Sequence, residues 1–159
     1  MKTYMLILFS YCGLKEINKR LKEKLNQSDE LFVRAVMLEK VPKLSEHLIS
    51  EVGVLGKKVV HDLEESVVDN YQDNAKNYLE EITEIAAENG FQLDKKIIDH
   101  HNLEDLKEEI KKSELDEIII NFSHNEFVSD QAEEENVKSW LHKLELSQDI
   151  FYDGKLKNK

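Results

Sequence analysis

Apolar residues are distributed along this chain in two alternating patterns. Short apolar runs predict five strands, at Tyr4–Ser10, Leu31–Leu38, Phe91–Ile98, Glu117–Phe122 and Asp149–Tyr152. Apolar positions repeated at three- and four-residue steps predict helices between them, over Leu14–Leu25, Lys58–Asn89, Leu103–Lys112 and Glu133–Leu144. A short helix over Ser45–Glu51 would fit the long connection after the second strand. Strands that alternate with helices predict a parallel sheet with right-handed crossovers.

The strand Glu117–Phe122 is predicted to lie at the centre of this sheet. Its β-branched run Ile118–Ile120 is typical of a strand buried on both faces. We therefore expect an α/β fold, a doubly wound five-stranded parallel sheet with helices on both faces. In such folds ligands bind beyond the carboxyl ends of the strands. The loop that follows this strand, residues 121–125, is therefore the first place to look for a site.

The composition excludes some classes of partner. The chain has 159 residues, 35% of them charged, and a net charge of −11. An acidic protein is poorly suited to nucleic acids or anionic membranes, because both require a basic surface. We expect a single domain over residues 1–154 and a basic C-terminal tail over 155–159.

The single cysteine and the short apolar runs restrict the chemistry further. Cys12 has no second cysteine with which to form a disulfide or a thiolate zinc cluster. A helix amino terminus beside it could activate the thiol, but a small, partly buried core residue is the simpler interpretation. The longest apolar stretch, Tyr4–Phe9, is too short to span a membrane. We expect a cytoplasmic protein without a metal site.

The layout resembles that of the universal stress protein family, whose fold is of the adenine nucleotide alpha hydrolase-like kind. The resemblance covers most of the chain and rests on the order of its elements more than on one motif. The segments that resemble the family are the opening strand and several parts of the second half of the chain: Met5–Phe9, Tyr78–Phe91, Lys96–Asp99, Leu103–Ile110 and Leu115–Ile120.

The glycine-rich signature of the ATP-binding members of this family is missing. Glycine lets backbone amides approach phosphate closely, and a following helix amino terminus favours the anion. This chain has no glycine between Phe91 and Asp153, and acidic residues (Asp130 and 133–135) stand near the expected phosphate loop. Gly53 and Gly56 have the signature's spacing, but they precede the long helix. The acidic residue that ATP-binding members carry after the first strand is also absent.

The resemblance therefore implies a non-enzymatic, homodimeric regulatory or interaction module in stress response, which binds an unknown protein partner and no ATP. One alternative is an ATP-binding member with a non-standard phosphate loop that uses Ser123, Asn125 and Asn136. Another is a small enzyme that depends on Cys12 or on histidines. The degenerate nucleotide pocket would contain polar residues from the ends of two strands and from the last helix: Ser10, Tyr11, Cys12, Asn121, Ser123, Asn125 and Asn136. Bulky groups, Tyr11 and Phe122 among them, are expected to narrow it.

The last strand, Asp149–Tyr152, is predicted to be short, apolar and at the edge of the sheet. Exposed edges favour pairing with another chain, and in the family that this chain resembles the corresponding strand often joins two subunits. The resemblance therefore implies a homodimer with Ile150, Phe151 and Tyr152 in the contact. An edge protected within one monomer is the alternative.

Overall fold

The computed structural model describes residues 1–37, 57–99, 102–124 and 134–157. The predicted helix over Ser45–Glu51 lies outside these residues. The strands are β1 (Thr3–Leu8), β2 (Glu30–Met37), β3 (Gln92–Asp99), β4 (Glu117–Phe122), β5 (Ser147–Tyr152) and β6 (Lys155–Leu156). The helices are α1 (Leu14–Lys24), α3 (Lys57–Asn89), α4 (Leu103–Lys112) and α6 (Glu134–Leu141).

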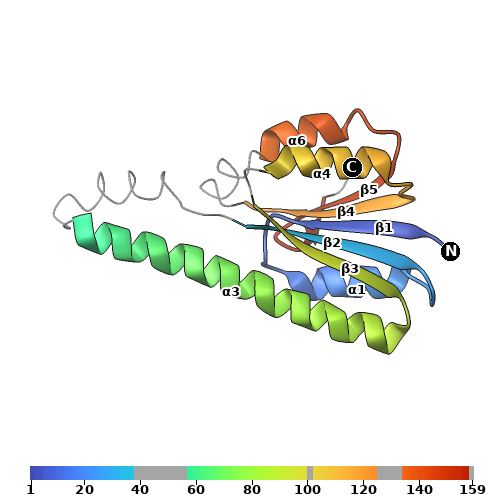
Figure 1. Cartoon of the computed structure of the whole chain (residues 1–159), viewed down its shortest axis with the longest axis horizontal. Helices are drawn as coiled ribbons and strands as arrows, with labels where there is room; N and C mark the ends of the chain where they lie inside the picture. Colours follow the sequence, from blue (N-terminus) through green and yellow to red (C-terminus); the bar gives the residue numbers. More distant parts are fainter. Residues whose placement is uncertain (38–56, 100–101, 125–133, 158–159) are drawn as a thin grey trace.

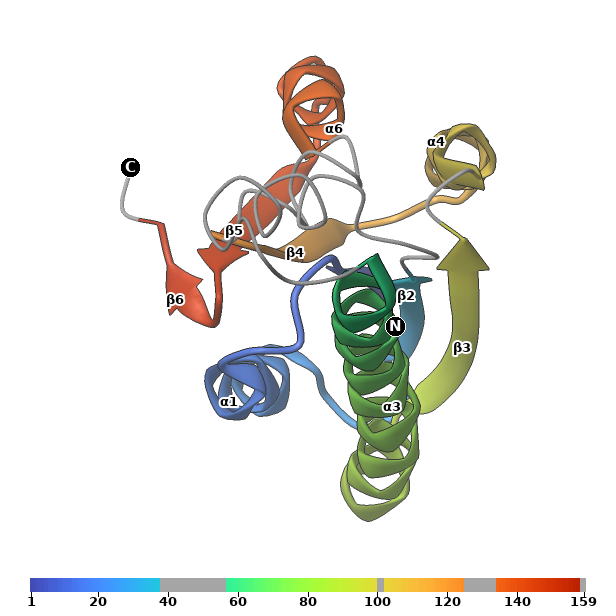
Figure 2. The same cartoon turned by 90° about the vertical axis from the view of Figure 1, so that its left-hand side faces the viewer.

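The strands form one sheet in the order β3-β2-β1-β4-β5-β6. β1 pairs in parallel with β2 and β4, and β3 and β5 extend the parallel pairing on either side. Helices α1 and α3 cover one face of the sheet and α4 and α6 cover the other (Figures 1 and 2). The α/β doubly wound arrangement that the alternating pattern predicted is thus present.

The central strands separate two apolar cores. Alternate residues of β1 enter different layers: Leu6 and Leu8 pack with α1 and α3, whereas Met5 and Ile7 pack with α4 and α6. Ile118, Ile119 and Ile120 of β4 are fully buried. Burying one such side chain contributes about 1.5–3 kcal/mol. The prediction that β4 is covered on both faces is confirmed.

Helix α3 has 33 residues and extends beyond the end of the sheet (Figure 1). Its carboxyl half packs on the sheet through Tyr78, Ile82 and Ile85, at the helical spacing seen in the sequence. Gly90 ends it with a left-handed backbone (φ 76°) and donates its N–H to Ala86 O at 2.8 Å. Glycine suits this conformation because it has no Cβ.

The prediction of five strands is wrong, because the sheet has six. The additional strand β6 pairs antiparallel with β5, placing Leu156 opposite Phe151 and Lys155 opposite Tyr152. The turn that joins them, Asp153-Gly154, has positive φ at both residues (49° and 84°). Asp-Gly is a dipeptide that favours such tight hairpin turns. Part of the predicted basic tail is therefore a strand.

Candidate functional site

The order of the strands reverses between β1 and β4, so that consecutive connections leave these strands toward opposite edges of the sheet. Ligands of open α/β sheets bind at the carboxyl ends of the strands at such a point. Five of the predicted pocket residues, Ser10, Tyr11, Cys12, Asn121 and Ser123, lie at or directly after the ends of β1 and β4.

Asn121, near the end of β4, is fully buried and connects the segments around it. Its side-chain amide donates to Ser10 O at 3.0 Å and to Cys12 O at 3.1 Å. Its side-chain oxygen accepts the N–H of Gly154 at 2.9 Å. The amide of Asn121 thus joins the segment after β1 to the turn between β5 and β6.

The β5–β6 turn lies against the end of β1. Ser10 Oγ donates to Asp153 Oδ1 at 2.5 Å, and the other carboxylate oxygen of Asp153 accepts the His124 N–H at 3.2 Å. A methyl group added to Gly13 would come within 2.6 Å of Gly154 Cα, and one added to Gly154 within 2.7 Å of the Gly13 carbonyl carbon. Only two residues without side chains allow this approach.

A second carboxylate reaches the end of β4 from α6. Glu134, the first residue of α6, is fully buried and accepts the N–H of Ser123 at 3.0 Å. Ser123 and His124 are consecutive, so two adjacent backbone N–H groups each donate to a carboxylate of the same chain. Neither Asp153, Glu134 nor His124 was among the predicted pocket residues.

Tyr11 and Cys12 differ in their surroundings. The Tyr11 hydroxyl donates to Val36 O at 3.0 Å, and burial raises the pKa of its phenol above the ordinary value. Cys12 is exposed, which corrects the expectation of a partly buried core residue, because the segment after β1 turns outward before α1. Its backbone N–H donates to Ser10 Oγ at 3.1 Å.

The remaining predicted pocket residues are not brought into this network. Asn136 is exposed in the first turn of α6, and within the described residues no hydrogen bond joins it to Ser10 or Asn121. Asn125 lies outside the described residues. Phe122 stacks on Phe9 with ring centroids 5.4 Å apart, and both are buried in the core beneath α4 and α6.

The three residues predicted for a dimer contact lie in different environments. Phe151 is buried, whereas Ile150 and Tyr152 are half-buried. Strand β6 pairs with this part of β5, and Ile150 O accepts the N–H of Lys157 at 2.8 Å. The outermost strand on this side is therefore β6, and the prediction that the strand over Asp149–Tyr152 lies at the edge of the sheet is wrong.

A groove of about 700 Å³ runs beside β5 and β6. Apolar side chains line much of it, with His142, Asp149 and Lys157 at its borders; the apolar members are Leu141, Leu144, Leu146, Ile150 and Leu156. Leu156 is 44% exposed. Of the three residues predicted for the dimer contact, Ile150 lines this groove.

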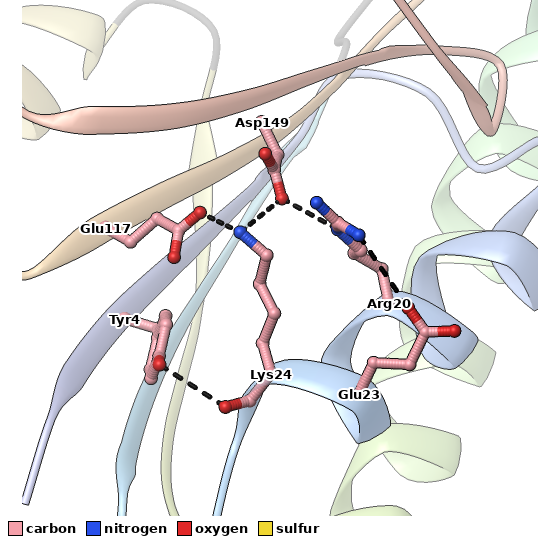
Figure 3. A network of polar contacts seen from close by, with 6 residues as sticks. All are labelled: Tyr4, Arg20, Glu23, Lys24, Glu117 and Asp149. Carbon is pink, nitrogen blue, oxygen red and sulfur yellow. Dashed lines mark hydrogen bonds and ion pairs between the residues drawn. The ribbon is translucent and has the colours of Figure 1, made fainter.

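A second polar network lies near the amino ends of β1 and β4 (Figure 3). Lys24 of α1 bonds both Glu117 and Asp149, the latter at 2.6 Å, and Arg20 Nε donates to Asp149 at 2.9 Å. Burial acts to raise the pKa of Asp149, but hydrogen bonds from Arg20 and Lys24 outweigh it and lower that pKa. The hydrogen bond to Asp149 raises the pKa of Arg20. These ion pairs fasten α1 to the sheet.

Arg34 of β2 is a buried cation that the apolar pattern of its strand did not predict. It is 3% exposed, donates through Nε to Glu109 of α4 at 2.7 Å, and bonds Asp94 of β3 at 3.0 Å. It also donates to Val33 O and Asp94 O, at 3.0 and 3.1 Å. A buried charge is tolerated only when it is paired in this way, so Arg34 has a structural role.

Two further findings concern the described residues alone. No group of three or more histidine, cysteine, aspartate or glutamate side chains among them is placed to hold a metal ion. None of the helices in the described ranges is both long and apolar enough to cross a bilayer.

Comparison with known proteins supports the fold class. The molecule is an α/β domain with a doubly wound, mostly parallel sheet. The solved structure of the hypothetical protein MJ0577 is similar over 94% of both chains, with a TM-score of 0.51 and 18% sequence identity. The hypothetical protein PH0823 aligns over 100% of both chains with a TM-score of 0.43 and 15% identity. A comparison with family models finds no match, and neither does one with curated proteins. The likeness to MJ0577 concerns the α/β fold alone.

Proposed function

We propose that this chain is a universal stress protein-like interaction module of the cytoplasm, which acts in stress response without catalysis and without binding ATP. The observation that carries this proposal is that the polar groups beyond β1 and β4 are hydrogen-bonded within the chain. The amide of Asn121, the hydroxyl of Ser10 and the N–H groups of Ser123 and His124 all have partners within the chain. A triphosphate would have to displace carboxylates to reach the Ser10 hydroxyl or the N–H groups of Ser123 and His124.

Thermal unfolding with and without Mg-ATP tests this part of the proposal. A ligand that binds the native state raises the free energy of unfolding by RT ln(1 + [L]/Kd), and the unfolding midpoint rises with it. We expect the midpoint to be unchanged by Mg-ATP at millimolar concentration, with Mg²⁺ and an equal ionic strength of NaCl as the control. A saturable rise would refute the proposal.

We further propose that the module is a homodimer that associates through the β5–β6 edge, with Ile150 and Tyr152 near the contact and Phe151 supporting it from the core. The apolar groove beside these strands supports this choice. β6 has two paired residues, so most of the contact would come from side chains and not from strand pairing.

Sedimentation velocity of two variants tests the dimer. Leu156 and Ile97 are both 44% exposed, but they lie on β6 and on β3, at opposite edges of the sheet. We expect Leu156→Glu to shift the protein to monomer and Ile97→Glu to leave it dimeric. A wild-type protein that is monomeric at tens of micromolar, or equal behaviour of the two variants, would contradict the proposal.

A further inference from the structure

We propose that Asp153 and Glu134 are internal substitutes for an anionic ligand, and that they occupy the positions that a small oxyanion would otherwise take beyond β1 and β4. The inference rests on the proposed function, since it gives a physical reason why the chain would not bind ATP. It goes further by naming the carboxylates that take up the donors beyond β1 and β4 and the ligand class that their removal would admit.

The donors at the end of β4 are of a kind that binds anions. Ser123 and His124 present consecutive backbone N–H groups directly after a central strand, where the chain bends. Consecutive N–H groups in a turn form anion-binding concavities in other folds. Here Glu134 accepts the first at 3.0 Å and Asp153 the second at 3.2 Å. Each carboxylate carries the charge and the acceptor oxygens of a bound oxyanion.

Asp153 also accepts a hydrogen bond from the Ser10 hydroxyl. Its second oxygen accepts Ser10 Oγ–H at 2.5 Å, a length typical of a hydroxyl bonded to a carboxylate. One carboxylate thus joins donors that follow two adjacent strands, β1 and β4. A tetrahedral oxyanion bound between these strands would make the same two contacts.

The backbone holds the Asp153 carboxylate in place independently of these contacts. The Asp153 N–H donates to Phe122 O at 2.9 Å, and the Gly154 N–H donates to Asn121 Oδ1 at 2.9 Å. Both residues are in the left-handed conformation, and Gly154 packs directly on Gly13. Two hydrogen bonds and one backbone contact therefore fix this turn. A foreign anion would have to compete with a carboxylate that the turn already holds in position.

Removal of the carboxylate tests the inference with inorganic phosphate as the probe. Asp153→Gly deletes the side chain, and glycine accepts the φ of 49° at this position. The matched control is Asp116→Asn, which changes net charge equally; Asp116 accepts the Thr3 N–H at 2.7 Å before β4 begins. We expect phosphate to raise the unfolding midpoint of D153G and to shift the amide resonances of His124 and Cys12 saturably. Wild type and D116N should show neither effect.

A folded D153G, as judged by circular dichroism, that does not respond to phosphate would overturn the inference, as would a wild type that responds equally. If D153G does not fold, Asp153→Asn decides, because asparagine also accepts this backbone. We then expect phosphate to raise the unfolding midpoint of D153N measurably, and no response would overturn the inference. If the Asp153 variants do not respond to phosphate and Mg-ATP does not change the wild-type midpoint, this inference fails but the proposed function still stands.

Discussion

Gly13 and Gly154 meet backbone to backbone, although they are far apart in sequence. An added Cβ on Gly154 would lie within 2.7 Å of the Gly13 carbonyl carbon, and both residues have positive φ (68° and 84°). This contact sets the β5–β6 turn against the start of α1. It brings the Asp153 carboxylate within reach of Ser10, whose hydroxyl donates to it at 2.5 Å.

Gly154→Ala is expected to destabilise the protein by at least about 2 kcal/mol. The left-handed conformation alone costs a residue with a Cβ about 1–2 kcal/mol, and the clash here is with backbone, which cannot rotate away. Gly90→Ala is the control, since its φ is similar (76°) but its Cβ would meet only the flexible Gln27 side chain at 2.9 Å. Urea unfolding should show a clearly smaller loss for G90A, and equal losses would argue against the contact.

Two neutralising substitutions around Arg34 are expected to differ in cost. The Glu109 side chain is 27% exposed and that of Asp94 is 55% exposed, so water screens the second ion pair more. We expect Glu109→Gln to cost about 2 kcal/mol, the value of a hydrogen bond to a charged group. Asp94→Asn should cost less than about 1 kcal/mol. Free energies of unfolding from urea titrations test the order, and a larger loss for D94N would refute it.

Asp149 predicts a pH dependence of stability. Its pKa is lowered in the folded protein, mainly by Arg20 and Lys24 against the opposing effect of burial. A lowered folded pKa contributes stability that is present above the unfolded value, about 3.9, and that is lost as the pH falls through the folded value. Urea unfolding between pH 7 and pH 3 should therefore show a shallower decline for Asp149→Asn than for wild type. Parallel curves would contradict the assignment.

Truncation of Ile120 and of Ile97 compares the stability contributions of a core residue and a sheet-edge residue. Ile120 is fully buried in β4, whereas Ile97 on β3 is 44% exposed. We expect Ile120→Ala to cost about 2–5 kcal/mol because it leaves a cavity between strand and helix. Ile97→Ala should change stability by less than about 0.5 kcal/mol. Thermal or urea unfolding measures both, and a comparable loss for I97A would place β3 in a buried environment.

Local sequence patterns predicted the parts of the fold that local chemistry determines. Ile118–Ile120 indicated a strand buried on both faces, and the apolar repeat predicted a helix that ends at Asn89, as α3 does, because burial and helical periodicity are local properties of the sequence. The Asp153-Gly154 dipeptide signals a hairpin, but the basic residues after it favour a solvated tail, and β6 forms there only because β5 pairs with it.

The closure of the site could not be predicted in the same way. The hydrogen bond from Ser10 to Asp153 joins residues 143 positions apart, and that from Ser123 to Glu134 depends on where α6 packs. The family resemblance predicts Ser10, Asn121 and Ser123 as members of a degenerate nucleotide pocket, and the structure places all three at or just after the ends of β1 and β4. Which partners satisfy them is a property of the tertiary structure.

Asn121→Asp is expected to be strongly destabilising at neutral pH although it hardly changes side-chain volume. The amide nitrogen of Asn121 donates to the carbonyl oxygens of Ser10 and Cys12. A carboxylate at that position has no hydrogen to donate and would repel both oxygens from a fully buried site. We expect a loss of more than about 3 kcal/mol, beyond the cost of an unsatisfied polar group.

The pH dependence of N121D stability separates the effect of the introduced charge from that of a poorly fitting side chain. Burial beside carbonyl oxygens favours the protonated acid, so the folded pKa of the introduced aspartate is raised. A raised folded pKa for an acid means that stability is higher below that value and falls as the pH rises through it. N121D should therefore recover part of the lost stability, relative to wild type, between pH 7 and pH 5, and Asn121→Ala should not. If both variants show the same pH profile, the donor role of the Asn121 amide is wrong.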